Sequence, residues 1–462
     1  MRPSAPVTPT LLLLLCTILV VAVSPARADT TRRALLLVSI DGLRPDYVQQ
    51  ADLHGLALPN LRQLARDGAS ASGVRGVLPS ATYPSHTTLL TGASPARHGI
   101  FFNKPFGVAV KDLDVWYCYT EDIRVPTLWD AATQGGLAVG SVSWPVSVGA
   151  TSIRYNIPEY NLTRTDEDVR ITRGAATPGL MAELEPAAGP YLTDVNQAIA
   201  RDEARTRYAV AMIRQKKPDL LTLHLAASDH LQHRTGPFTP PVREALEKID
   251  RMISDVSAAM RAAHPHAVVC VVSDHGFAAV DRVLWLDSAF VRAGIITLKT
   301  RGKTVADSDV SDWIAQTWPA GGSAAIVLRN PTDVAARAKV KAVLDELATD
   351  PANGIAGILE EPAIAALGGA PTAQFWVDLR PGFIVNQALQ PTIVGRVSAR
   401  GTHGYTPTHD EMASTFIIAG DGIANGRDLG TIDMRAIAPT LAQVLGVTLP
   451  SAERPPLDVF EH

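Results

Sequence analysis

The sequence predicts an α/β fold: a doubly wound, mainly parallel sheet flanked by helices, with a small inserted α+β lobe. Short, continuous apolar runs alternate along the chain with longer segments that carry apolar residues at helical spacing. Such runs are typical of strands buried on both faces of a parallel sheet, and the alternation is typical of doubly wound proteins. Between residues 276 and 400 the pattern changes to shorter elements separated by Gly and Pro, which indicates an insertion.

The first part of the core is expected to span residues 29–275. Residues 34–40 form the first predicted strand. Residues 59–68 predict a helix that ends at Gly68, with Asn60 as its N-cap, and residues 82–91 predict a second helix. The same alternation then predicts helices at 127–135, 203–216 and 242–263 and strands at 137–142, 219–225 and 267–272.

The inserted lobe is expected to span residues 276–400, with an apolar run at 324–329 and a helix at 332–347. The last part of the core, residues 401–462, resumes the earlier pattern. It contains a predicted strand at 415–419 and a predicted helix at 435–445.

Residues 1–28 are predicted to be a signal peptide. Arg2 supplies a weakly positive start, residues 11–23 form an apolar run, and Ala26-Arg27-Ala28 provides a small-x-small cleavage site. The apolar run is short for a membrane span, although an uncleaved anchor is the alternative. No later stretch is long and apolar enough to span a bilayer. We therefore expect an exported protein, periplasmic or secreted, with no membrane span after cleavage.

Charge and cysteine content limit the classes of function. The net charge is −4, from 42 Lys+Arg and 46 Asp+Glu, so no basic excess indicates a nucleic-acid-binding surface. We expect a small or medium-sized substrate instead. Outside the signal segment only Cys118 and Cys270 occur. We expect two unpaired thiols, with Cys270 in the core, although an exported protein could also bridge them.

Polar side chains directly follow two of the predicted strands. Asp41 comes after the first strand, and Asp274 and His275 come after the strand that ends at residue 272. Functional groups in open α/β sheets gather at the carboxyl ends of strands, and carboxylate and imidazole are normal zinc donors. Taken singly, Asp41 is as well explained as an ordinary turn residue.

Three further residues also carry carboxylate or imidazole groups that could bind a metal. Asp229 and His233 are four residues apart, so on a helix they lie on one face. His403 lies in the loop Gly401-Thr-His-Gly404, where it is either an exposed loop histidine or a ligand.

Thr82 lies at a predicted helix start, two residues before Pro84. A hydroxyl there is often only a cap. It also lies in the positive field of the first backbone N–H groups, which favours a bound phosphate or an alkoxide. Together the patches supply six nitrogen or oxygen donors and one hydroxyl, which suits two metal ions with an alcohol between them.

As an ordered set, seven motifs resemble the nucleotide pyrophosphatase/phosphodiesterase family of the alkaline phosphatase superfamily. They are Ser39-Ile-Asp41-Gly-Leu-Arg-Pro-Asp-Tyr47, Thr82-Tyr-Pro-Ser-His86, Thr91-Gly92, His98-Gly-Ile-Phe-Phe-Asn103, Asp229 to His233-x-x-Gly-Pro237, Ser273-Asp-His-Gly276 and Thr402-His-Gly-Tyr405. The resemblance runs from residue 34 to about residue 449.

The resemblance implies a set of roles for these residues. One zinc ion would be held by Asp229, His233 and His403. The second would be held by Asp41, Asp274 and His275, with the Thr82 hydroxyl bound to it as the nucleophile. Asn103 would donate to a phosphoryl oxygen. Two zinc ions per chain are expected, although Asp and His donors also bind manganese and iron.

The implied activity is that of a secreted, metal-dependent phosphodiesterase or nucleotide pyrophosphatase. It would hydrolyse a small-molecule phosphodiester or nucleotide, at a phosphodiester or phosphoanhydride bond, through a phospho-threonine intermediate. The alternative is an alkaline phosphatase-like phosphomonoesterase, which needs an extra Arg or Lys near the phosphate. No clear candidate is apparent, with Lys104 and Arg154 the nearest in sequence. A non-catalytic binding protein is a remote alternative, since every expected site residue is present.

Overall fold

The structure is a computed structural model that describes residue 1 and residues 33–107, 115–160, 167–300, 308–398 and 400–461. The predicted signal peptide and its cleavage site therefore lie outside the described residues, apart from Met1. The chain divides into two units, Met1–Thr31 and Arg32–His462, and all helices and strands of the described residues belong to the second. In the described part of the chain, no helix combines the length and the apolar character needed to cross a membrane.

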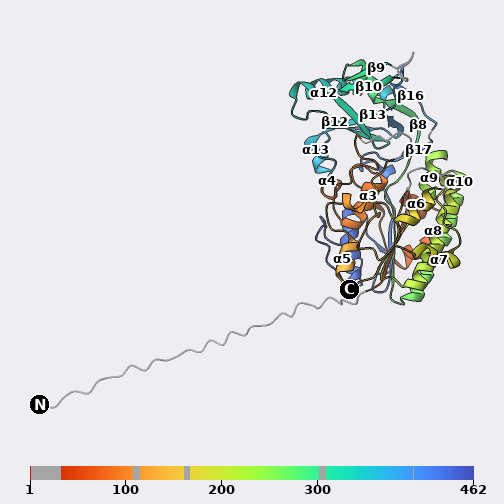
Figure 1. The fold of residues 1–462 in the computed structure, drawn as a ribbon. Coiled ribbons are helices and arrows are strands. Elements are labelled where there is room, and N and C mark those ends of the chain that lie inside the picture. Colours follow the sequence, from red (N-terminus) through yellow and green to blue (C-terminus); the bar gives the residue numbers. More distant parts are fainter. Residues whose placement is uncertain (2–32, 108–114, 161–166, 301–307, 399, 462) are drawn as a thin grey trace. The chain divides into compact units, whose positions relative to one another are not determined.

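An eight-stranded sheet lies among the helices of this second unit (Figure 1). Its strands have the order β19-β2-β18-β7-β1-β6-β4-β5. The strands from β7 to β5 run parallel to their neighbours, whereas β18 is antiparallel to both β7 and β2. This confirms the predicted doubly wound, mainly parallel sheet. The strands are β1 (Leu35–Ile40), β2 (Gly68–Ser70), β4 (Val139–Val142), β5 (Tyr155–Ile157), β6 (Leu220–Leu225), β7 (Val268–Val272), β18 (Phe416–Gly420) and β19 (Arg427–Asp428).

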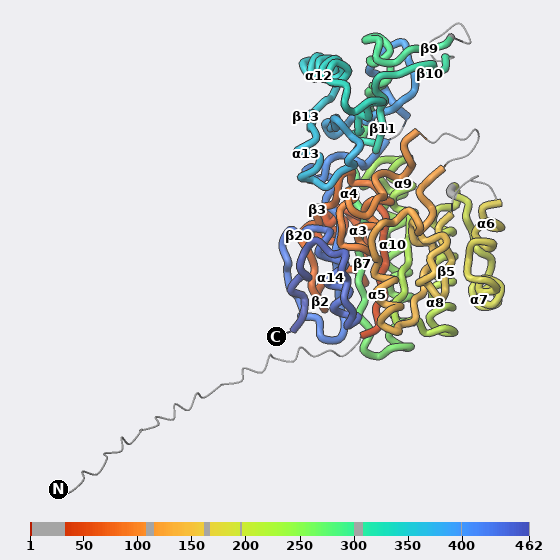
Figure 2. The backbone as a smooth tube through the Cα atoms, turned by 60° about the vertical axis from the view of Figure 1, so that its left-hand side comes forward, coloured from red at the N-terminus to blue at the C-terminus, as the bar shows by residue number. Residues whose placement is uncertain are grey.

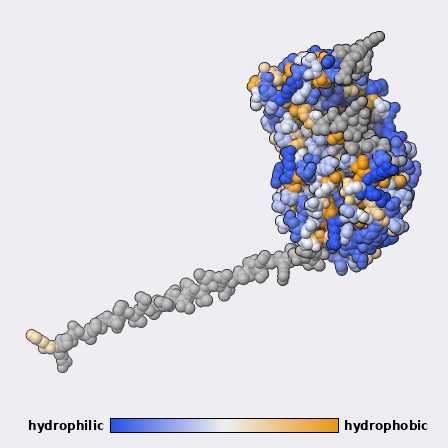
Figure 3. All heavy atoms as spheres, in the orientation of Figure 1, coloured by the Kyte–Doolittle hydropathy of each residue, from blue (hydrophilic) through white to orange (hydrophobic). Residues whose placement is uncertain are grey.

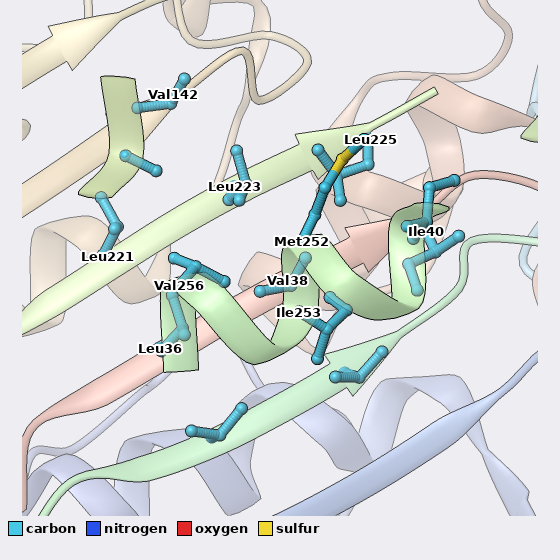
Figure 4. Close-up of a cluster of buried hydrophobic side chains, with 14 of the residues drawn as sticks. Leu36, Val38, Ile40, Val142, Leu221, Leu223, Leu225, Met252, Ile253 and Val256 are labelled. Atoms are coloured by element: carbon cyan, nitrogen blue, oxygen red, sulfur yellow. The ribbon is translucent and has the colours of Figure 1, made fainter. Parts of the chain in front are cut away.

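Strand β1 is apolar throughout because both of its faces are buried. Leu36, Val38 and Ile40 belong to one core cluster, which also contains residues of β6 and α10 (Pro240–Ala263), as Figure 4 shows. Leu35 and Leu37 point to the other face and belong to a second cluster. A strand with this alternation between two cores can only lie inside a sheet that is covered on both sides.

Helices pack on both faces of the sheet (Figures 1 and 2). The first cluster takes side chains from α2 (Pro59–Arg66), α7 (Leu180–Ala188), α8 (Ala198–Lys216), α9 (Ala227–Thr235) and α10. The second takes side chains from α3 (Thr82–Thr91), α5 (Leu128–Gln134) and α14 (Ile437–Leu445). On the face of the molecule in Figure 3, apolar residues are scattered among hydrophilic ones.

The elements between Ala278 and Thr402 form separate, smaller sheets, which confirms the α+β lobe. One sheet has the order β11-β12-β14-β13, another joins β15, β8 and β16 with β17, and β9 pairs with β10. The lobe has its own apolar core, which includes Phe290, Ile326 and Phe375. Its elements are β8 (Ala278–Trp285), α11 (Leu286–Arg292), β9 (Ile296–Thr300), β10 (Ser308–Trp313), β11 (Ala315–Pro319), β12 (Ser323–Leu328), α12 (Val334–Thr349), β13 (Ile355–Glu360), α13 (Glu361–Ala366), β14 (Phe375–Leu379), β15 (Gly382–Asn386), β16 (Val394–Arg396) and β17 (Gly401–Thr402).

Short elements connect the larger ones. They are α1 (Pro45–Gln49), β3 (Gly73–Arg75), α4 (Pro95–His98), α6 (Glu167–Ala175) and β20 (Thr431–Asp433), with 3-10 turns at Thr120–Asp122, Val195–Gln197, Pro351–Asn353, Asp410–Met412 and Met434–Ala436. Cys118 and Cys270 are both buried free thiols, as expected, and Cys270 lies in the core strand β7.

The predicted capping of α2 by Asn60 is wrong. The helix begins at Pro59, its N-cap is Leu58, and no side chain of the cap residue bonds to the helix. Asp250 of α10 takes this role instead: its carboxylate accepts hydrogen bonds from the backbone N–H groups of Asn60 (3.1 Å) and Leu61 (2.8 Å). A carboxylate at a helix N-terminus satisfies orphan donors and stabilises the helix dipole, whichever part of the chain supplies it.

Candidate metal centre

Candidate metal ligands predicted from the sequence lie together at the carboxyl ends of three adjacent strands. Asp41 follows β1, Asp274 and His275 follow β7, and Asp229 is on α9, which begins directly after β6. Because β7, β1 and β6 are neighbours in the sheet, these three loops meet at one edge.

Two groups of side chains could each hold a metal ion. The first consists of Asp229, His233 and His403, and the second of Asp41, Asp274 and His275; within each group the donor atoms lie within 4.8 Å of one another. These groups match the two ligand sets that the family resemblance implied.

The two groups are immediate neighbours. The rings of His275 and His403, one from each group, stack at a centroid distance of 3.7 Å. The Thr82 hydroxyl lies 3.3 Å from His275 Nε2. The structure therefore brings the nucleophile candidate to the same place as both donor groups.

Each candidate histidine ligand is oriented through its other ring nitrogen. Nδ1 of His233 lies 3.0 Å from the Gly401 carbonyl oxygen. Nδ1 of His275 lies 3.0 Å from the Gly276 carbonyl oxygen, and Nδ1 of His403 lies 3.1 Å from that of Ser80. A carbonyl oxygen only accepts, so Nδ1 carries the proton in all three, and each Nε2 keeps its lone pair. This arrangement is typical of histidines that bind metals.

The carboxylates also suit a cation. Among the described residues, Oδ1 of Asp41, Oδ1 of Asp229 and Oδ2 of Asp274 are buried and have no hydrogen-bond partner. Burial, and then the charges of Asp274 and Asp229, raise the pKa of Asp41 well above its usual range. Like charges without compensation are costly in a buried site, and divalent cations would offset that cost.

Two of the three candidate histidine ligands are in the protonation state that metals need. For the third, His233, burial is outweighed by the charge of Asp229 and by hydrogen bonds to Asp229 and Gly401, which raise its pKa. Burial lowers the pKa of His275 to about 4 and that of His403 to about 3. Both imidazoles are therefore neutral near pH 7, the form in which histidine binds a metal. The residues present fit two divalent cations in donor type, burial and orientation.

Thr82 is the first residue of α3 rather than its cap, since the N-cap is Ala81. The side chain is therefore free of capping and lies near His275. Asn103 is fixed beside it, because its Oδ1 accepts a hydrogen bond of 2.9 Å from the Tyr83 backbone N–H. That bond leaves the Asn103 Nδ2 group as a donor for a ligand.

A pocket of about 500 Å³ opens above these residues. Its lining includes Thr82, Asn103 and residues of both donor groups, together with Tyr83, Trp116, Glu159, Arg201, His224 and His230. The inserted lobe contributes Ala320, Gly321 and Ile384. Neither Lys104 nor Arg154 belongs to the lining formed by the described residues.

A buried polar chain behind Asp41 was not predicted. His224 Nε2 lies 3.1 Å from Asp41 Oδ2, and its Nδ1 lies 3.0 Å from Glu159 Oε2. Tyr83 donates its hydroxyl to Glu159 Oε1 at 3.1 Å. A histidine inside the buried, leucine-rich strand β6 was the available signal for His224, whereas Glu159 lies in a loop without one.

His230 is half-buried and lines the pocket, one helical position from Asp229.

Comparison with known proteins gives one consistent result. The family model for type I phosphodiesterase / nucleotide pyrophosphatase matches residues 35–406. The chain is 28% identical over 261 residues to human ectonucleotide pyrophosphatase/phosphodiesterase family member 7, which covers 56% of this chain and 51% of that protein. It is 25% identical over 270 residues to venom phosphodiesterase 2 of Crotalus adamanteus, covering 55% of this chain and 28% of the relative. The chain thus spans about half of the length of the first of these curated relatives and less of the second.

Solved structures share the fold. Human ectonucleotide pyrophosphatase/phosphodiesterase 5 superposes with a TM-score of 0.62 at 18% identity, covering 90% of this chain and 96% of that one. An inactive variant of the murine protein, in complex with AMP, gives a TM-score of 0.61 at 19% identity and the same coverage. With a family model that matches most of its length, the chain belongs to the type I phosphodiesterase/nucleotide pyrophosphatase family.

Proposed function

We propose that this protein is an exported, metal-dependent phosphodiesterase or nucleotide pyrophosphatase that hydrolyses its substrate through phosphorylated Thr82. The observation that carries the proposal is the position of the Thr82 hydroxyl, 3.3 Å from His275 Nε2 and beside two groups of three metal donors. Family membership supports the same reaction class.

In this proposal one divalent cation is held by Asp229, His233 and His403, and a second by Asp41, Asp274 and His275. Zinc suits the mixture of carboxylate and imidazole donors, and manganese or iron would also be accepted. When bound, such cations lower the pKa of a neighbouring hydroxyl and stabilise charge on the attacking and leaving oxygens of an in-line displacement.

The chain's own residues bind and orient the substrate. Thr82 Oγ1 attacks phosphorus from the first turn of α3, whose N-terminal field stabilises negative charge. Asn103 Nδ2 donates to a phosphoryl oxygen, and its placement is fixed by the bond from Tyr83 N–H. Water then hydrolyses the phospho-threonine and restores the Thr82 hydroxyl.

The substrate class is a small phosphodiester or a nucleotide. The pocket of about 500 Å³ has the size of a small-molecule site. Tyr83 and Trp116 offer aromatic surface in its lining, with ring centroids 5.1 Å apart. Relatives named as nucleotide pyrophosphatases and phosphodiesterases support this class.

We further propose that residues 1–28 are removed on export, to the periplasm or the outside, and that residues 276–400 are an insertion in a core made of residues 29–275 and 401–462. The names of the relatives, which denote ectoenzymes and venom enzymes, support export.

The experiment is a comparison of kcat/KM for a p-nitrophenyl nucleoside diester and for p-nitrophenyl phosphate, using the protein from Asp29 purified with zinc. We expect diester hydrolysis that is lost after chelation and falls by about 10³-fold or more in Thr82→Ala, because the nucleophile is gone. Thr82→Ser is the matched control, since it keeps a hydroxyl and should retain part of the activity.

Diester hydrolysis that survives Thr82→Ala would exclude Thr82 as the nucleophile. A preference for the monoester would move the protein to the phosphomonoesterase class.

A further inference from the structure

One buried cation in the pocket is unused by the proposed chemistry. Arg201, on the second turn of α8, is only 5% exposed and lines the same pocket as Thr82 and Asn103. Its Nε is buried without a hydrogen-bond partner, and among the described residues its guanidinium has no ion pair. Burial lowers the pKa of Arg201, and the positive charge of Arg205 lowers it further.

Asp202 and Glu159, the two carboxylates whose charges act on Arg201, are already bonded to other donors. Glu159 Oε2 pairs with Arg205 Nη2 at 3.4 Å, in addition to the bonds from His224 and Tyr83. Asp202 accepts the backbone N–H groups of Ala226 at 3.1 Å and Ala227 at 2.7 Å. The negative charges of these carboxylates partly offset the lowering of the pKa of Arg201, but neither carboxylate forms an ion pair or a hydrogen bond with it.

Arg205, one turn further along α8, is a buried arginine with a structural role and serves as a comparison for Arg201. It contacts Glu159, Asp202 and the His224 carbonyl oxygen, at 3.4, 3.5 and 3.2 Å. Arg201 has the same burial and none of these contacts. An unpaired buried charge is costly to the fold, and such groups are concentrated at sites that receive a ligand.

We propose that Arg201 is a specificity-determining residue that binds a second anionic group of the substrate, a phosphate or a carboxylate. A guanidinium presents a planar fork that such groups accept in pairs. This inference rests on the proposed function and narrows its substrate class: the preferred substrates carry more than the single negative charge of a simple phosphodiester. The second charge lies outside the transferred phosphoryl group, for example on the leaving group, because a second charge on the transferred group would make the substrate a phosphomonoester.

The test uses three substrates with Arg201→Met and Arg201→Lys. The p-nitrophenyl ester of thymidine 5′-phosphate carries one negative charge, p-nitrophenyl phosphate carries a second charge on the transferred group, and ATP carries further charges on the leaving group. We expect Arg201→Met to lower kcat/KM for ATP by about 10- to 100-fold more than for the singly charged diester, the loss expected for a charge-assisted hydrogen bond. Arg201→Lys should restore part of the loss for ATP. A larger loss for p-nitrophenyl phosphate than for ATP would place the second charge on the transferred group and contradict the proposal.

Two controls separate binding from folding. Arg214→Met removes an exposed arginine of the same helix and should leave all three rates unchanged. Arg201→Met should melt at the same or a higher temperature than the unaltered protein, because it removes an unpaired buried charge, whereas Arg205→Met should melt lower. A drop in Tm for Arg201→Met as large as that for Arg205→Met would show a structural role and overturn the proposal.

An equal change in kcat/KM for all three substrates would also overturn it. If the unaltered protein hydrolyses none of them, the proposed function fails by itself. Calorimetric titration with inorganic pyrophosphate then tests the role of Arg201 in binding. We expect pyrophosphate to bind at least tenfold more weakly to Arg201→Met than to the unaltered protein, and an unchanged affinity contradicts the proposal.

Discussion

At the scale of single residues, the site depends on side chains whose orientation is fixed by hydrogen bonds from the atoms that point away from the site. Nδ1 of His233, His275 and His403 each faces a backbone carbonyl oxygen, so each Nε2 is aimed into the site before any ligand binds. Asn103 is held in the same way through its Oδ1. Preorganised donors of this kind stabilise developing charge without reorganisation during the reaction.

Asn103 provides a prediction at this scale. Asn103→Ala should lower kcat for the diester by about 10²- to 10³-fold, the loss typical of removing one donor to a developing oxyanion. Asn103→Asp is the matched variant, because it keeps an acceptor for Tyr83 N–H but replaces the donor with a negatively charged oxygen, which should lower kcat at least as much. Steady-state kinetics of both variants check this: an aspartate variant with unchanged kcat would show that Asn103 holds Tyr83 in place rather than the phosphoryl group.

At the scale of elements, the positions of the candidate residues could be predicted because strand ends are local features. An apolar run followed by Asp41 or by Asp274-His275 places those groups at the carboxyl edge, and the sheet order then brings them together. Contacts between distant segments could not be predicted. The carboxylate of Asp250 caps α2 from 190 residues away, and nothing near Asn60 in sequence indicates it.

The lining of the pocket could not be predicted for the same reason, because it depends on contacts between distant segments. Arg201 lies on α8, which begins at Ala198 rather than at the predicted residue 203. The sequence around Arg201 does not distinguish it from Arg205. Only the packing of α8 against β6 and the loop that carries Glu159 shows which arginine is paired and which faces the pocket.

Helix α11 of the inserted lobe provides a prediction on stability. Asp287, in its first turn, is 7% exposed, and burial raises its pKa to about 6. The unfolded chain has the ordinary value of 3.8, so the folded state binds this proton more tightly. The contribution of Asp287 to stability is therefore greatest below about pH 4 and is lost as the pH rises through 6.

Asp287→Asn should remove this dependence, because the amide stays neutral and still offers an oxygen to Thr317 N–H, which bonds to Asp287 at 3.3 Å. We expect a variant that is more stable at pH 8, by up to about 3 kcal/mol, and little changed at pH 4. Thermal melts between pH 4 and 8 measure it, with Glu346→Gln, an exposed change on α12, as control. A constant difference between the two proteins across this range would contradict the assignment.

At the scale of the whole molecule, the site is shared by the sheet and the lobe. Gly322 N–H donates to the His403 carbonyl oxygen at 2.8 Å, and a side chain at Gly321 would collide with that same oxygen. The lobe thus fixes the loop that carries one candidate ligand, while the sheet edge carries five others. Both parts must be folded for the two donor groups to form, so metal binding reports on the complete arrangement.

The most direct measurement is the metal content of the purified chain after dialysis from zinc. We predict two zinc ions per chain in the unaltered protein and about one in Asp229→Ala/His233→Ala and in Asp274→Ala/His275→Ala. His266→Ala, which removes an exposed histidine, should keep two. Two ions in the unaltered protein, with one lost from each paired variant, is the result expected of two separate metal sites around Thr82. Zinc content that is below one per chain, or that is the same in both paired variants and the unaltered protein, would contradict a two-metal centre.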